Sequence, residues 1–156
     1  MAENFRTGAV GAILDIYEDA IFNFKRTIET IPDDQLTIEL RSAATECRSI
    51  QAILSHVVHA AFGYATSIHN SMGNGLIRPD KTFHLSIEKY LNDLDNVFSY
   101  TENIFSAITD NDLEELDFSL KIKTGWGQFY DIEQLMEHAI VHLLRHQRQL
   151  ENVIHV

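Results

Sequence analysis

The sequence is poor in cysteine and in basic residues, and each shortage excludes a class of protein. The single cysteine, Cys47, allows neither an internal disulfide nor a cysteine-based zinc site, and we expect it to be a passive thiol. Because 12 Lys and Arg stand against 23 Asp and Glu, the formal net charge is −11. Nucleic acids and anionic membranes bind clustered cations, so this balance argues against both as partners.

Targeting and membrane-spanning patterns are also missing. The opening MAENFRTGAV has no basic segment followed by an apolar run, so it predicts no signal peptide. The apolar runs are interrupted by Asp, Glu or His before they are long enough to span a bilayer. We therefore expect a cytoplasmic protein, with residues 1–156 forming a single domain whose 45% hydrophobic residues suffice for a core.

Proline is scarce, and the long stretches between turn-like segments carry the periodicity of helices. Pro32 and Pro79 are the only two prolines, and both lie in turn-like text. Apolar residues recur at helical spacing over about 8–30, 50–72, 86–108 and 131–153, with Ser49 and Asp131 as expected N-caps. The predicted fold is all-α, a four-helix bundle with a long connection between helices 3 and 4. In that connection DFSLKIKT could form a short strand or an extended arm.

Histidine, in contrast, is abundant, and three of the eight histidines form a ladder in EHAIVHLLRHQRQL. His138, His142 and His146 follow one another at four-residue intervals. Side chains so spaced on a helix lie about 6 Å apart on nearly the same face, and two imidazoles there can bind one metal. The helical angles place His142 and His146 beside the apolar stripe and turn His138 toward solvent. Ordinary surface or hydrogen-bonded histidines are the alternative.

A third ligand has to come from another part of the chain. The segment SIQAILSHVVHAAF holds His56 and His59 in a nearly apolar run, and buried imidazoles need polar partners. Periodicity does not decide between the two. Competing motifs are missing: HAIVH lacks the glutamate of HExxH, no glutamate precedes a histidine by three residues, and no phosphate-binding loop or nucleophile elbow is present.

The helical layout, the segment SIQAILSH and the segment HLLRHQRQ together resemble the DinB/YfiT-like superfamily. The resemblance implies a divalent metal bound by one histidine of the second helix and two of the last. His56 matches the first, and His142 and His146 match the pair because a glutamine follows three residues later. The family often has His-Arg-Gly-Gln where this chain has His-Gln-Arg-Gln, which leaves the pair intact. Residues expected around the metal, as supporting or pocket residues, are His59, His138, Gln149 and Trp126.

The resemblance also implies a function. Members include S-transferases that use low-molecular-weight thiols and metal-dependent hydrolases, so we expect a metal-dependent enzyme, acting as a homodimer on a small electrophilic substrate. We expect Zn or Ni as the metal, with Fe or Mn as the alternatives. Three imidazoles leave a position open where water or a thiol could be activated. No general base is evident, because Gln149 does not titrate and Asp131 or Glu137 is expected to cap or solvate the helix.

Several alternatives stay open at this point. The metal could join two helices of a non-catalytic, structural bundle, or the chain could bind no metal. The aromatic residues Trp126, Phe129 and Tyr130 of TGWGQFY could equally line a pocket or cap the core. The aromatic residues of the third helix are expected in the core rather than at a substrate; these are Tyr90, Phe98, Tyr100 and Phe105.

Overall fold

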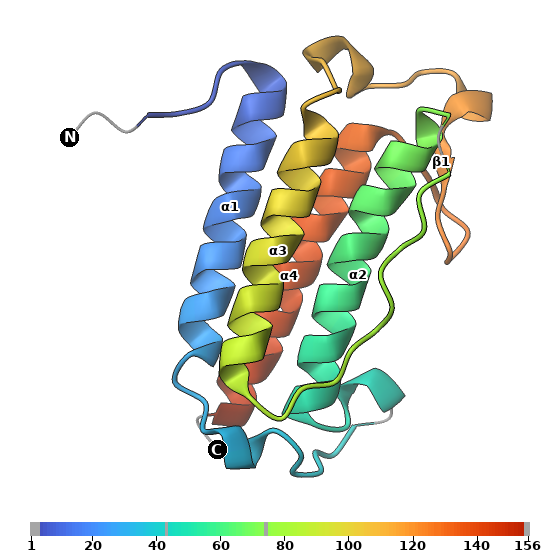
Figure 1. The fold of residues 1–156 in the computed structure, drawn as a ribbon. Coiled ribbons are helices and arrows are strands. Elements are labelled where there is room, and N and C mark those ends of the chain that lie inside the picture. Colours follow the sequence, from blue (N-terminus) through green and yellow to red (C-terminus); the bar gives the residue numbers. More distant parts are fainter. Residues whose placement is uncertain (1–3, 43, 74, 155–156) are drawn as a thin grey trace.

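The computed structural model describes residues 4–42, 44–73 and 75–154, and four long helices contain most of them. The helices are α1 (Gly8–Ile28), α2 (Ile50–Ser71), α3 (Ile87–Phe105) and α4 (Ile132–Ile154). They lie side by side, α1 packing on α3 and α4, and α2 also packing on α3 and α4 (Figure 1). The predicted four-helix bundle is confirmed, and the helix bounds agree with the sequence to within a few residues. No helix in the described part is long and apolar enough to cross a membrane.

The two predicted caps fix where α2 and α4 begin. Ser49 Oγ accepts a hydrogen bond from the backbone N–H of Ala52 at 2.9 Å. Asp131 Oδ1 accepts from the N–H of Gln134 at 2.8 Å, and Gln134 Oε1 accepts from the N–H of Asp131 at 3.0 Å. These bonds satisfy N–H groups that the first turn of a helix leaves free, and the second pair forms a capping box. Fixed starts hold the histidines of both helices at defined positions.

Apolar side chains from all four helices meet in one core. They recur at three- and four-residue spacing, so each helix buries one stripe and exposes the opposite face. Two of the third-helix aromatic residues, Tyr90 and Phe105, are fully buried, and Phe98 and Tyr100 pack against the core from its edge. The largest fully buried side chains are Tyr17, Tyr90, Phe24, Ile28, Leu36, Ile53, Leu54, Ile68, Leu94, Leu135, Met136 and Leu143.

Short elements occupy the connections. The segment between α1 and α2 contains the 3-10 helices η1 (Asp33–Gln35) and η2 (Thr45–Cys47). The α3–α4 connection contains η3 (Asp110–Asp112), η4 (Phe118–Leu120) and the strands β1 (Ile122–Lys123) and β2 (Phe129–Tyr130). The strands form an antiparallel hairpin that packs on α2 and α4. DFSLKIKT therefore forms a 3-10 turn and then a short strand.

Over residues 75–86, between α2 and α3, the described chain forms neither helix nor strand, and we call this segment the α2–α3 connector. It runs back along the outer side of α2 as an extended chain (Figure 1). At one end the Asn70 side chain accepts from the N–H of Leu76 at 2.7 Å and donates to its carbonyl at 3.0 Å. Further along, the Arg78 guanidinium lies directly over Gly63 of α2.

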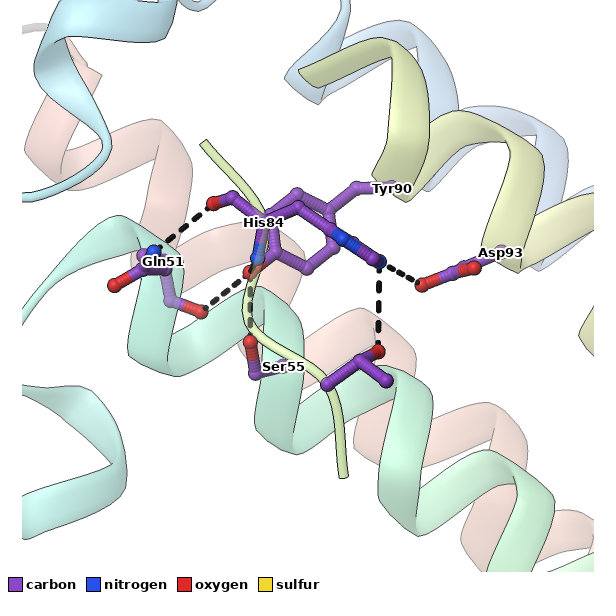
Figure 2. Close-up of polar contacts among 6 residues, drawn as sticks. Gln51, Ser55, His84, Tyr90 and Asp93 are labelled. Carbon is purple, nitrogen blue, oxygen red and sulfur yellow. Dashed lines mark hydrogen bonds and ion pairs between the residues drawn. The ribbon is translucent and has the colours of Figure 1, made fainter. Parts of the chain in front are cut away.

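The other end of the connector is held by a hydroxyl from α3. The buried Tyr90 hydroxyl accepts from the N–H of His84 at 3.0 Å, lies 2.7 Å from Ser55 Oγ and donates to the Gln51 carbonyl at 3.3 Å (Figure 2). Gln51 Nε2 donates to the His84 carbonyl at 2.9 Å, and His84 Nε2 donates to Asp93 at 2.7 Å. One side chain thus joins α2, α3 and the connector.

Tyr90→Phe is expected to loosen this end of the connector. The variant leaves the His84 N–H and the buried Ser55 hydroxyl without this partner, so the free energy of unfolding should fall by about 1–3 kcal/mol. Urea denaturation measures the loss, and amide hydrogen exchange at residue 84 should become faster.

Tyr100→Phe is the matched control, because its hydroxyl lies 2.8 Å from Thr66 Oγ1, which also donates to the Phe62 carbonyl. This variant should lose less stability and leave exchange at residue 84 unchanged. Equal losses in the two variants, with unchanged exchange in both, would contradict the role given to Tyr90.

Candidate metal centre

Three histidines come together where α2 packs against α4. His56 extends from α2, and His142 and His146 extend from α4; one nitrogen of each lies within 4.8 Å of the other two. Nε2 of His56 and Nε2 of His142 are 3.0 Å apart. Two nitrogens bound to one metal at about 2.0–2.1 Å lie roughly 3 Å apart, so this pair already has a suitable separation. The three histidines could therefore hold a metal ion.

The helix rotation expected from the apolar stripe explains how α4 presents its pair. His146 is 5% exposed, whereas His142 and His138 are only partly buried. The four-residue spacing places the His142 and His146 rings 4.5 Å apart, and both face His56. His59, one turn further along α2, does not join the cluster.

Burial favours the neutral form of all three imidazoles. Burial lowers the pKa of His56 to about 4 and that of His142 to about 3, and it also lowers the pKa of His146. Protonating any of the three would place charge beside the other imidazoles, which lowers the pKa of His56 and His142 further. All three imidazoles are consequently neutral near pH 7, which is the form that binds metals.

A glutamine accepts a hydrogen bond from the most buried of the three histidines, and the cysteine bonds to that glutamine. His146 Nδ1 donates to Gln149 Oε1 at 2.8 Å, which leaves Nε2 of His146 available to a metal. The buried Cys47 thiol donates to the same oxygen at 3.8 Å. The sequence predicted Gln149 beside the histidine pair, but it did not predict Cys47 there, since the cysteine lies more than one hundred residues before Gln149, in η2.

Aromatic side chains line one side of the cluster. Trp126, at the turn of the hairpin and 48% exposed, stacks on His138 with ring centres 4.6 Å apart. Tyr64 of α2 contacts the Trp126, His138 and His142 rings edge-on, at centroid distances of 6.3, 5.4 and 5.7 Å. Tyr130 also reaches His138, at 5.9 Å. We call Tyr64, Trp126, Tyr130 and His138 the aromatic wall.

The three hairpin aromatic residues do not all take the same one of the two expected roles; Tyr130 also packs against the core. Trp126 and Tyr130 lie beside the ladder, as a pocket wall would. Phe129 instead pairs with Phe118 at 4.5 Å, outside the wall, and is 37% exposed. Tyr64 was missed in the sequence because one aromatic residue among the apolar residues of α2 has the pattern of a core residue.

A carboxylate that the sequence did not indicate lies on the surface near the cluster. Glu46 of η2 is exposed, and it lies close enough to His56, His146 and Lys81 to interact electrostatically with each. Its own backbone N–H is the main cause that lowers its pKa, so Glu46 is ionised at neutral pH. Asp131 caps α4, as expected.

The metal-free protein is expected to lose stability as the pH falls from about 7 to about 4. The unfolded chain binds protons at His56 and His142 near the ordinary pKa of 6.5, whereas the folded protein takes them up only near 4 and 3. In this window the unfolded state therefore holds more protons, and acid favours it. The slope cannot exceed about 1.4 kcal/mol per pH unit for each histidine, because each differs by at most one bound proton between the two states.

Urea denaturation of chelator-treated protein across this range would measure the slope. His142→Gln should flatten it, whereas His69→Gln, outside the cluster, should follow the wild type. If the free energy of unfolding of His142→Gln changed with pH as it does in the wild type, His142 would not be held neutral by burial.

Gln149→Leu is expected to weaken metal binding without removing a ligand. Loss of the bond to His146 Nδ1 frees the ring to rotate, and such supporting partners typically contribute roughly 10–100-fold to metal affinity. Competition with a chromogenic chelator measures the affinity. Gln147→Leu on the same helix, whose amide donates to Glu151, should bind metal like the wild type. Equal affinities in both variants would show that Gln149 has no orienting role.

The comparisons with known proteins agree with this geometry. A comparison with curated proteins gives no match. The family model described as DinB family matches residues 16–155, which include all three clustered histidines and the four helices except the start of α1. The chain therefore belongs to the DinB family.

Proposed function

We propose that this chain is a metal-dependent enzyme in which His56, His142 and His146 bind one divalent metal, Zn or Ni as first choice and Fe or Mn as the other. The observation that carries the proposal is the convergence of three neutral imidazoles from two helices, with His146 already oriented by Gln149. All-imidazole donor sets suit these metals. Three protein ligands are also the number found in catalytic zinc sites, where a fourth position stays open.

The reaction we propose is attack by a low-molecular-weight thiol, or by water, on a small electrophilic substrate. The metal would lower the pKa of the nucleophile toward neutrality. In the thiol reaction, a carbon–sulfur bond forms while the bond to the leaving group breaks, and the thiol proton passes to a base. Glu46, ionised and close to the cluster, is the base we propose. Hydrolysis differs in that water supplies the nucleophile.

The aromatic wall gives the substrate a place to bind. The exposed part of Trp126 can stack against a planar or apolar group. Tyr64 contacts both Trp126 and His142, so the aromatic surface is continuous up to the His142 ring. Burial raises the pKa of Tyr64 to about 12, so Tyr64 stays a neutral surface throughout the working range of pH. The wall would also keep bulk water from one side of the reacting atoms.

Metal content tests the proposal most directly. Protein purified without a His tag or chelator should contain about one equivalent of metal by mass spectrometry. His142→Ala should weaken metal binding by more than the roughly 10–100-fold expected for a residue that only orients a ligand. His69→Ala, outside the cluster, should keep the wild-type content.

Activity assays then distinguish thiol transfer, hydrolysis and a purely structural metal site. The metal-loaded protein should accelerate either displacement of halide from an activated aryl halide by a thiol or hydrolysis of an activated ester, and His142→Ala should abolish the acceleration. Metal bound without either activity would favour the structural bundle. No metal, and no rise in melting temperature on adding Zn, Ni, Mn or Fe, would refute the enzyme proposal.

A further inference from the structure

The α2–α3 connector carries cations toward the histidine cluster. It is fixed to α2 at two levels, Arg78 over Gly63 and His84 beside Gln51. Six residues of extended chain span about 20 Å, and twelve helical residues rise about 18 Å. The two lengths agree, so the connector runs nearly straight and antiparallel to α2. Lys81, midway between the anchors, therefore lies level with the turn of α2 that carries the histidines.

The contact at Gly63 places the arginine on the same face of α2 as a proposed ligand. A Cβ atom at Gly63 would lie 2.7 Å from Arg78 Nη1, so the guanidinium occupies the space that a side chain would fill. Gly63 follows His56 by seven residues, which is two turns and about 10 Å along one face of a helix. The Arg78 guanidinium thus lies on the face of α2 that also carries His56, about two helical turns from it.

Among the residues that the structure describes, neither Arg78 nor Lys81 forms an ion pair. The salt bridges found within the described residues involve Arg6, Lys25 and His84, but not Arg78 or Lys81. Because the chain carries a net charge of −11, two cations on one short segment beside the cluster differ from the acidic character of the chain as a whole.

The positive charges of Arg78 and Lys81 act on the histidines of α2. After burial, Arg78 and then Lys81 are the next causes that lower the pKa of His59, and Lys81 also lowers the pKa of His56. The acidic groups near these histidines are Asp80, in the connector, and Glu46. Both are exposed, and neither forms a salt bridge with Arg78 or Lys81.

We propose that Arg78 and Lys81 form an anion-binding subsite beside the histidine cluster, which recognises a carboxylate or phosphate on the molecule that reacts there. Arginine suits this role because its planar fork donates two parallel hydrogen bonds to either group. The statement about the reacting molecule rests on the proposed function, whereas anion binding by the connector does not. With the aromatic wall on another side, the preferred ligand would carry an anionic end and an apolar end.

Nuclear magnetic resonance titration of the 17.8 kDa protein tests the subsite with and without zinc. The probes are succinate, its neutral analogue succinamide and inorganic phosphate, at constant ionic strength because exposed charges are screened. Succinate or phosphate should shift the Gly63 amide and Arg78 side-chain signals saturably, and succinamide should not. The double substitution Arg78→Gln with Lys81→Gln should weaken binding roughly fivefold and leave zinc content unchanged.

Two further variants make the test specific. Arg26→Gln removes a cation from α1, on the opposite side of the bundle from α2 (Figure 1), and should bind succinate like the wild type. Gly63→Ala removes no charge, but its Cβ displaces the mobile end of Arg78; it should weaken anion binding while the helix keeps its stability.

No saturable shift by either anion, or equal affinity in the wild type and the double variant, would overturn the subsite. Preference for phosphate over succinate would support it and identify the anionic group. Because the titration is also made on the metal-free protein, its result does not depend on whether zinc binds. Failure of metal binding would refute the proposed function alone.

Discussion

The packing of α2 against α4 is the constraint on which the candidate site depends. His56 belongs to one helix and the His142–His146 pair to the other, so neither helix forms the cluster alone. Moving neutral imidazoles out of water requires polar partners, and here the partners are the other imidazoles and Gln149. The same burial suppresses protonation, so protons compete weakly for these nitrogens at neutral pH. One helix interface therefore both gathers the donors and keeps them in their metal-binding form.

Most of the fold could be predicted from the sequence because local signals and burial agree. Apolar residues at helical spacing indicated four helices, and side chains at Ser49 and Asp131 fixed two of their starts. The connections could not be predicted in the same way. DFSLKIKT has the alternation of a strand, yet its strand contains only Ile122 and Lys123, because Thr124 already bonds to Gln128 in the turn that follows. The path of the α2–α3 connector depends on a tyrosine of the following helix, which no local pattern shows.

The candidate site was predictable in part, for similar reasons. The four-residue spacing on α4 placed His142 and His146 together without any knowledge of the fold, but periodicity alone did not choose between His56 and His59. Both lie off the apolar stripe of α2, and only the position of α4 brings His56, rather than His59, to the pair. The groups contributed by connections, such as Glu46 and Lys81, left no sequence signal, since their approach to the cluster is set by tertiary contacts.

This arrangement divides two tasks between two parts of the molecule. The donors lie on long helices whose starts and cores are fixed, so their mutual positions follow from the packing that stabilises the bundle. The hairpin and the α2–α3 connector face the site from outside the core, and Trp126, Arg78 and Lys81 are exposed. Substitutions at exposed positions usually change stability little, so under the proposed function these segments could change the bound molecule without disturbing the cluster. A family built on this plan can keep one metal chemistry on the helices and change its substrates through the connections.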